Sequence, residues 1–321
     1  MKTITPRNYA AKAANSLRAF VERHGAGNDL ESDLPAIRST IDMIEGATHF
    51  AVPDGGVTLE NDLRGLEGHE ARLPYPYITL EFRSQDYSAP EAKSRAVPSN
   101  LLLAYETTTD ELAARYPYRT NPERFAKRPD GEAGIALLFL FGEDERMWML
   151  NPYALFIPRT WESIAQRQQV GGWALKYLPF CVQPATVEYG LKDPSRGEPF
   201  FESLIEVLGP AGYALLTFCE ALTCRNVSIG TLREAAPQQV NSRRERNGKL
   251  PLYEIKTLMI EVPTGEGIEV ERKGTSGERS GPRAHLRRGH VRRLASGNIW
   301  INSMIVGAKN GGWIEKGYNV K

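Results

Sequence analysis

The pattern of apolar and polar positions predicts helices at the start of the chain and strands after them. Residues 5–23 begin with a Thr5–Pro6 pair that is typical of a helix start, and the rest of the run is rich in Ala, Leu and Arg. A second short helix is expected over 34–45. Strand-like segments, separated by a polar loop at 84–100, then cover 48–52, 77–83 and 101–107.

The most apolar part of the chain predicts the centre of the main sheet. Residues 135–141 read IALLFLF, a polar turn follows at 142–145, and residues 146–157 are again apolar and aromatic. This pattern predicts a β-hairpin with one strand buried on both faces. A pair of helices is expected over 200–223, broken at Gly209 and Pro210. Its second helix is apolar almost all round, which predicts burial inside the fold.

Strands and turns are predicted to dominate after Pro237. A polar loop is expected at 273–281, and strands are expected at 252–262, 268–272, 283–294, 299–306 and 313–320. Together the elements predict an α+β fold: a mostly antiparallel sheet with an N-terminal helix, a central buried helical pair and a C-terminal basic β-meander. We expect an acidic α+β body over 1–236, with the basic meander of 237–321 packed on it as one compact unit.

Composition narrows the class of protein. The chain has 321 residues, 41% of them hydrophobic, and a formal net charge of +1, which is typical of a soluble globular protein and excludes a disordered one. Three cysteines make a disulfide framework improbable and favour a reducing cytosol. The first 20 residues lack the apolar core of a signal peptide, and no apolar run reaches the roughly 18 residues of a membrane span. We expect no membrane association.

Cofactor and metal motifs are missing from the sequence. It contains no Walker loop, dinucleotide fingerprint or nucleophile elbow. Cys219 and Cys224 form a lone CxxxxC, which is a weak metal signal because a structural zinc site needs four ligands. We therefore expect no cofactor and no metal.

Charge is distributed unevenly along the chain. Residues 237–321 carry a net charge of +8, and residues 1–236 carry −7. A basic segment joined to an acidic body is the pattern expected of a protein that binds a polyanion.

The basic residues are concentrated in two stretches. Residues 282–293 read PRAHLRRGHVRR, with five arginines, two histidines and no acid, and an NSRRERNGK loop is expected at 241–249. If 283–293 is one strand, its alternation places arginine on both faces, which makes the strand hard to bury. The residues that could contact successive phosphates are Arg243, Arg244, Arg246, Lys249, Arg283, Arg287, Arg288, Arg292 and Arg293.

Three interpretations of this basic surface remain open. It could bind nucleic acid through a two-stranded ribbon. Its arginines could instead form ion pairs on neighbouring strands, in which case the surface has no ligand; the expected partners are Glu254, Glu261, Glu269 and Glu271. It could also bind an acidic protein.

A catalytic interpretation depends on His285 and His290. Metal-independent RNA cleavage needs two imidazoles on opposite sides of one phosphate, with a cation nearby. On a regular strand these two side chains face opposite ways, unless a bulge at Gly289 shifts the register. Acidic residues of the body could also form metal or acid-base pairs, although surface charge is the commoner role; they include Glu81, Asp86, Glu106, Asp110 and Glu111.

The C-terminal block resembles a group of uncharacterised proteins from bacteriophages and prophages. The resemblance is carried by PRAHLRRGHVRRLASGNIWINSMIVG, by the terminal GYNV and by APQQVNSRRERNGKLPLYEIKTLMIE, and is clearest over the last hundred residues. The shared form is HxRRGHxRR followed by an apolar strand that contains Trp. The resemblance implies a phage or mobile-element origin and expression in the cytoplasm of a bacterial host. It implies no reaction.

The sequence thus favours a phage accessory protein that binds nucleic acid, or a host nucleic-acid machine, through a basic hairpin. A metal-independent nuclease that uses His285 and His290 is an alternative. A virion structural protein or an inhibitor of a host defence complex is another. Whether the chain is an enzyme stays open, with the balance against it.

Overall fold

The computed structural model describes residues 4–25, 29–59, 63, 66–84, 99–116, 131–143, 147–160, 162, 165–167, 173–175, 178–191, 206–261, 283–287, 289–301, 304–306 and 308–313. Its helices are α1 (Tyr9–Arg23), the 3-10 helix η1 (Glu31–Asp33), α2 (Leu34–Gly46), α3 (Thr109–Arg115), α6 (Pro184–Leu191), α8 (Leu208–Leu222) and α9 (Gln238–Arg246). Among these described helices, none combines the length and the apolar character that a membrane span requires.

A nine-stranded mixed sheet forms the centre of the molecule. The strand order is β10 (Val227–Arg233), β11 (Ile255–Ile260), β1 (Thr48–Ala51), β2 (Tyr77–Arg83), β3 (Ser99–Thr108), β4 (Ala133–Glu143), β6 (Tyr153–Pro158) and β9 (Leu178–Cys181), with β5 (Met147–Leu150) also paired to β4. Strand β1 is parallel to both β2 and β11, and the other pairs of this sheet are antiparallel. The predicted α+β class with a mostly antiparallel sheet is confirmed.

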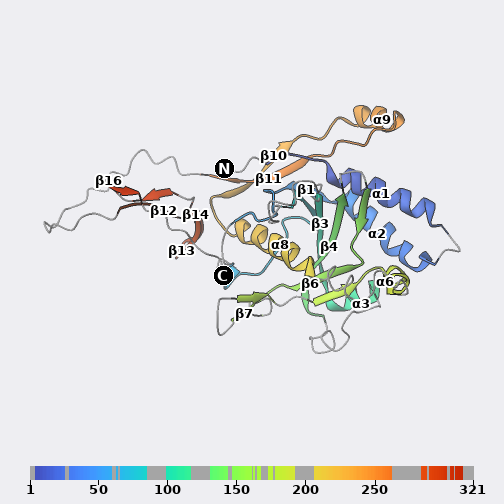
Figure 1. Cartoon of the computed structure of the whole chain (residues 1–321), viewed down its shortest axis with the longest axis horizontal. Helices are drawn as coiled ribbons and strands as arrows, with labels where there is room; N and C mark the ends of the chain where they lie inside the picture. The colour runs from blue at the N-terminus through green and yellow to red at the C-terminus, as the bar shows by residue number, and fades with distance from the viewer. Residues whose placement is uncertain are drawn as a thin grey trace.

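Helices cover both faces of this sheet (Figure 1). Helix α8 packs on one face, where Phe218 contacts Phe50 with ring centroids 5.0 Å apart. Helices α1 and α2 pack on the other, where Tyr9 lies against Trp148. The central strands β3 and β4 are therefore buried on both sides, as the continuous apolar run in 135–141 predicts.

Two predicted boundaries near the sheet were wrong. The strand expected over 146–157 is interrupted at Asn151 and Pro152, where the Asn151 side chain accepts the Tyr153 N–H at 2.9 Å, so β5 and β6 form in place of one strand. Helix α8 was expected to begin after Gly209 and Pro210 but contains both in its first turn. Proline is tolerated there because first-turn N–H groups have no partner within the helix. The first helix of the expected pair lies mostly outside the described residues.

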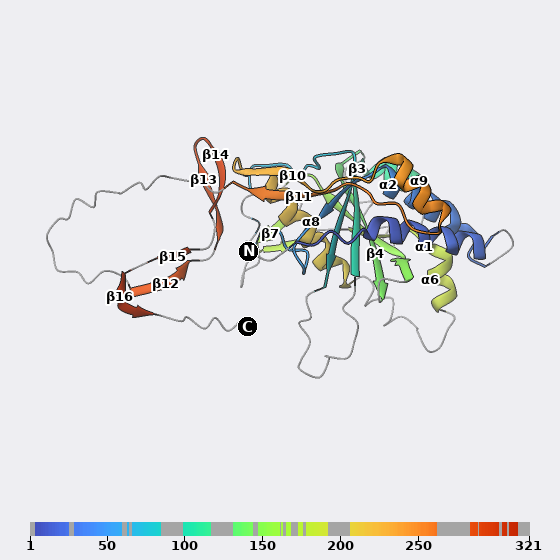
Figure 2. The same cartoon turned by 90° about the horizontal axis from the view of Figure 1, so that it is seen from above.

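The C-terminal strands are connected differently from a meander. Strand β12 (Arg283–Arg287) lies between β15 (Met304–Val306) and β16 (Ala308–Trp313), and β13 (His290–Leu294) pairs with β14 (Gly297–Ile301) as a separate hairpin (Figure 2). A further small hairpin joins β7 (Ala165–Arg167) to β8 (Trp173–Leu175). Strand β16 mostly occupies residues between the strands expected at 299–306 and 313–320. The described strands here form two small sheets because β12 pairs with later strands and not with β13.

The boundary expected at residue 236 falls between two paired strands of the main sheet. Strand β11 lies between β10 and β1, so a segment from the predicted basic part is an interior strand of the body. The two parts share one sheet at this point.

A buried carboxylate on the central sheet fixes the start of α1. The helix begins at Tyr9, later than the Thr5–Pro6 pair predicts, because Glu81 of β2 accepts three backbone N–H groups in front of it. The donors are Arg7 at 2.6 Å, Tyr9 at 2.7 Å and Asn8 at 3.3 Å. Glu81 is 2% exposed, and burial raises its pKa while the three backbone hydrogen bonds act in the opposite direction.

Asn8 supports this arrangement through its backbone and its side chain. Its φ of 61° lies in the left-handed region, which asparagine tolerates better than most residues. The side-chain oxygen accepts a hydrogen bond from Arg233 at 2.7 Å, and the side-chain nitrogen donates to the Pro251 carbonyl at 2.8 Å. The start of α1 is thereby tied to the strands at the sheet edge.

A second long-range cap uses Asp33, at the end of η1. Its fully buried carboxylate accepts the N–H groups of Ala185 at 2.9 Å and Thr186 at 2.8 Å, at the first turn of α6. A carboxylate at a helix N-terminus also interacts favourably with the helix dipole. The N-terminal part of the chain therefore anchors a helix about 150 residues away.

His49 is a buried polar side chain of β1 that contacts Thr79, two residues before Glu81 on β2. Its Nδ1 is 2.8 Å from the Thr79 hydroxyl, and its ring stacks on Tyr253 at 4.7 Å between centroids. Burial, and secondarily the charge of Arg233, lowers the pKa of His49 to about 4.

Replacing Glu81 by Gln should destabilise the fold by about 2 to 3 kcal/mol, because an amide N–H₂ would face N–H donors of α1. The free energy of unfolding from urea denaturation measures the effect. Glu188→Gln, the same change at an exposed position of α6, should alter stability by no more than about 0.5 kcal/mol. Equal losses in the two variants would contradict the role of Glu81.

The contribution of His49 to stability should fall as the pH drops from 6.5 towards 4. In that window the unfolded chain protonates His49 while the folded chain keeps it neutral, so unfolding is favoured by up to roughly 3 kcal/mol, and the contribution is constant above pH 6.5. The slope of unfolding free energy against pH should be shallower in His49→Gln. The idea fails if His49→Gln keeps the wild-type slope.

Candidate nucleic-acid interface

A helix-bearing arm extends from the edge of the main sheet. The arm, residues 234–254, connects β10 to β11 and carries α9 at its tip (Figures 1 and 2). Strands β10 and β11 are antiparallel and their last pair joins Arg233 to Ile255. The arm therefore starts and ends at one place in the sheet.

Two side chains on the inner side of α9 hold the helix on the arm. The Asn241 amide donates to the carbonyls of Ala236 and Leu252, both at 3.3 Å, and accepts the Leu252 N–H at 2.9 Å. Arg244 donates from Nε to the Leu250 carbonyl at 2.8 Å. None of the nine residues of α9 is buried. Hydrogen bonds, and not a hydrophobic interface, therefore hold the helix in place.

The C-terminal end of α9 is closed by a Schellman motif. The Lys249 N–H donates to the Arg244 carbonyl at 2.8 Å, and the Gly248 N–H donates to the Glu245 carbonyl at 2.9 Å. Gly248 has a φ of +66°, the left-handed conformation that this motif requires. The segment 241–249, expected as a loop, is thus mostly helix, and its Asn-Gly pair is the helix stop.

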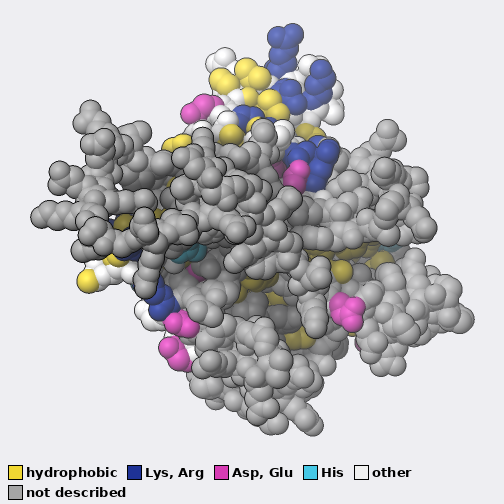
Figure 3. All heavy atoms as spheres, turned by 60° about the vertical axis from the view of Figure 1, so that its left-hand side comes forward, with side chains coloured by type: hydrophobic (Ala, Val, Ile, Leu, Met, Phe, Trp, Pro, Cys, Tyr) yellow, Lys and Arg dark blue, Asp and Glu magenta, His cyan; other side chains and the backbone are white. Residues whose placement is uncertain are grey.

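The outward side of α9 carries a polar and cationic stripe. Gln239, Ser242, Arg243 and Arg246 are exposed and follow the i, i+3, i+4, i+7 spacing of one helix face. Asn241 and Arg244, between them in sequence, are only half-exposed. Figure 3 shows Lys and Arg side chains gathered at the top of the molecule, at the height of α9. We call these four residues the α9 stripe; the arginine pair at helical spacing is the sequence signal for it.

The terminal basic block is divided between two sheets at Gly289. Strand β12 pairs His285 with Val306, and β13 pairs His290 with Ile301. The Trp300 ring lies on Gly289, and a Cβ there would be 2.5 Å from the ring, so a side chain would clash. The single strand expected over 283–293 was wrong. The two histidines lie on different strands, so alternation along one strand does not determine whether their side chains share a face.

The β13–β14 hairpin is docked on the body through Asn226 and Trp300. The Asn226 side chain accepts the Trp300 N–H at 2.8 Å and donates to the Trp300 carbonyl at 2.9 Å. The Trp300 ring packs with Leu59, Ala221 and Cys224 at the end of α8. A side-chain amide thus pairs with the edge of β14 as a neighbouring strand would.

The arginines of the hairpin differ in their surroundings. Arg293 forms an ion pair with Glu67 at 3.1 Å, so an ion-pair interpretation holds for this residue with a partner in the body. Arg292 is exposed on the opposite face of β13. Of the predicted partners, Glu254 pairs instead with Lys256 at 2.8 Å. Glu269 and Glu271 lie outside the described residues, as do the side chains of Arg283, Arg287 and Arg288.

The predicted basic residues therefore fall into two groups. Helix α9 holds Arg243, Arg244 and Arg246, with Lys249 directly after it. Strands β12 and β13 lie at the other end of the molecule in both views (Figures 1 and 2). The structure does not join the two groups into one surface.

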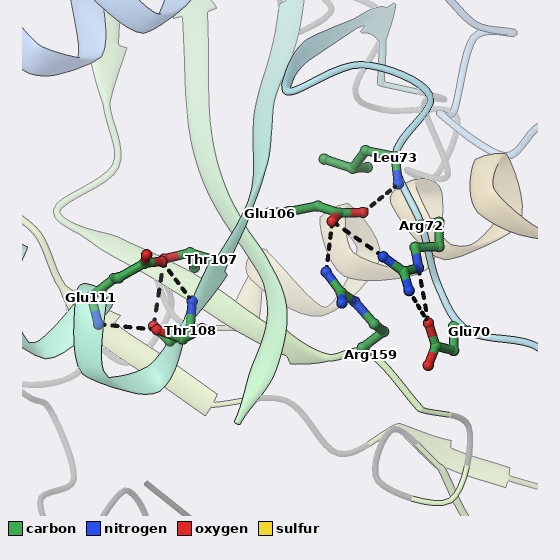
Figure 4. Close-up of polar contacts among 8 residues, drawn as sticks. All are labelled: Glu70, Arg72, Leu73, Glu106, Thr107, Thr108, Glu111 and Arg159. Carbon is green, nitrogen blue, oxygen red and sulfur yellow. Dashed lines mark hydrogen bonds and ion pairs between the residues drawn. The ribbon is translucent and has the colours of Figure 1, made fainter. Parts of the chain in front are cut away.

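The acidic candidates of the body are engaged in structural contacts. Glu106 of β3 accepts the Arg159 guanidinium at 2.6 Å and the Leu73 N–H at 3.2 Å, and Arg72 lies 3.8 Å away (Figure 4). Arg72 also pairs with Glu70 at 2.6 Å. This cluster joins the segment before β2 to the ends of β3 and β6.

Two further acidic candidates, Asp110 and Glu111, belong to the start of α3. Glu111 and Thr108 form a capping box, in which Glu111 accepts the Thr108 N–H at 3.1 Å (Figure 4). Asp110 lies in the same first turn, where a carboxylate stabilises the helix dipole. Asp86 lies outside the described residues.

The three cysteines have thiols that stay protonated. Burial raises the pKa of Cys219 to about 12 and those of Cys181 and Cys224 to about 11. Thiolate is the metal-binding and nucleophilic form, so these environments disfavour both roles. In the part of the chain that the structure describes, no group of three or more His, Cys, Asp or Glu side chains is arranged to hold a metal ion.

Comparisons of the chain with protein-family models, with curated proteins and with solved structures found no match. The resemblance of the terminal block to phage and prophage proteins stays a prediction.

Replacing Asn226 by Ala should loosen the β13–β14 hairpin, because the edge of β14 loses two hydrogen bonds to Trp300. Trypsin cleavage after Arg292 and Arg293 should accelerate at least several-fold, with little change in global unfolding. Asn247→Ala, at the end of α9, is the matched control and should leave these cleavage rates unchanged. Unchanged cleavage in Asn226→Ala would show that the hairpin is held by other contacts.

Proposed function

We propose that this chain binds nucleic acid through the α9 stripe and Lys249. The observation that carries the proposal is a helix that buries no side chain and directs its structural contacts inward, through Asn241 and Arg244. A nine-residue helix of low apolar content has little stability of its own. Hydrogen bonds of the arm hold this helix at the surface, as expected of a helix that contacts a partner.

Charge favours a polyanion as that partner. Arg243, Arg246 and Lys249 are exposed, and none of them forms an ion pair with any residue that the structure describes. Glu245 is the single acid in the helix. Guanidinium groups on an exposed helix can bind backbone phosphates with charge-assisted hydrogen bonds.

The predicted biological setting is retained within this proposal. A phage accessory protein in the cytoplasm of a bacterial host would meet nucleic acid or a nucleoprotein complex there. The arginines of β12 and β13 would form a second contact region, with Arg292 as its described and exposed member. Helix α9 then provides the main contact with nucleic acid, in place of the terminal block that the sequence favoured.

Removing three charges in Arg243→Ala/Arg246→Ala/Lys249→Ala should weaken binding of a labelled 20-base-pair DNA duplex at least tenfold at about 100 mM salt. The slope of log affinity against log salt should decrease in magnitude by at least about 0.9, the value expected for one lost phosphate contact. Fluorescence anisotropy over a salt series measures both quantities.

The control is Arg23→Ala/Arg38→Ala/Arg225→Ala, which removes the same charge from exposed positions outside the arm. It should retain most of the wild-type slope. The proposal is wrong if wild type binds no nucleic acid, or if the two triple variants lose affinity equally.

A further inference from the structure

The α9 stripe mixes charged and uncharged hydrogen-bonding groups, which phosphate binding alone does not require. Gln239 and Ser242 are neutral, and they share one helix face with Arg243 and Arg246. Amide and guanidinium groups are the side chains that form paired hydrogen bonds with base edges: Arg with guanine O6 and N7, and Gln with adenine N6 and N7. The composition of the stripe therefore suits base edges as well as the backbone.

The dimensions of α9 suit the major groove of duplex DNA. Nine residues of helix are about 14 Å long, and the major groove is about 12 Å wide and accepts an α-helix. In A-form RNA the major groove is too deep and narrow for side chains to reach the bases. Duplex RNA should therefore be a poorer ligand for this helix.

The arm presents the stripe to such a ligand. Helix α9 lies at the outer margin of the molecule, above α1 and α2 in Figure 1. The inward contacts of Asn241 and Arg244 fix which side of the helix faces outward. Lys249 follows α9 on an exposed turn.

We infer that α9 is a recognition helix that enters the major groove of duplex DNA and contacts base edges through the stripe. This inference rests on the proposed function. Gln239 provides a separate test because it is uncharged: its loss should change base preference and leave the salt dependence intact. Gln238 is a matched control, since it is the same residue type, also exposed, and lies about 100° away around the helix.

The experiment selects bound duplexes from a pool with a randomised 12-base-pair core, using the full-length wild type, Gln239→Ala and Gln238→Ala. Wild type should enrich a base preference. Gln239→Ala should relax that preference at one or two positions by at least fivefold with an unchanged salt slope, whereas Gln238→Ala should select as wild type does. A duplex RNA carrying the wild-type preferred sequence should bind at least tenfold more weakly than the DNA duplex.

Binding without base preference, the same preference in Gln239→Ala and wild type, or equal affinity for duplex RNA and DNA would overturn the inference. In those cases a salt-dependent loss in Arg243→Ala/Arg246→Ala/Lys249→Ala would leave the proposed function standing. If no nucleic acid binds and an acidic protein is the ligand, both the function and the inference are wrong.

Discussion

The arrangement of this protein depends on one carboxylate that takes the place of a helix cap. Glu81 projects from the second strand of the central sheet and receives the N–H groups that begin α1. Because these donors are backbone groups, the contact fixes the position and direction of the helix, whatever its side chains are. Asn8 then connects the same point to Arg233 and Pro251, at the base of the arm. Helix, sheet and arm thus share a single buried junction.

The carboxylates of the body do not neutralise the exposed cations of α9, because several of them have structural roles. Glu81 and Asp33 cap helices from distant parts of the chain, Glu106 binds Arg159, and Glu111 closes its own capping box. The cations of α9 have no comparable role apart from Arg244. Net charge alone does not reveal this difference, since the arm carries four basic and three acidic side chains.

Hydrophobic periodicity was sufficient to predict the parts of the fold that are buried. The apolar runs that became β3, β4 and α8 are packed on two faces, so their pattern reports their environment directly. The same reasoning missed α9, because a helix that buries nothing has no apolar period and looks like a loop. Its polar spacing and the Asn-Gly stop at 247–248 are the signals that remain.

Long-range contacts account for the other differences. A side chain at Gly289 would clash with Trp300, and the start of α1 depends on Glu81, more than 70 residues away. No local window of sequence contains both Glu81 and the start of α1. The basic residues were identified correctly as a charge feature, but their division into two surfaces is a property of topology that composition does not encode.

The position of β11 constrains how the chain can be synthesised and divided. During translation β1 has no partner on one edge until residues near 260 have emerged, because β11 supplies that partner in parallel orientation. An unpaired strand edge exposes backbone N–H and C=O groups, which can pair with a strand of another chain. A fragment that stops before β11 would keep this edge exposed and would be prone to self-association. The arm therefore lies in sequence between β10 and β11, and a chain shortened before β11 would lose the strand that covers this edge.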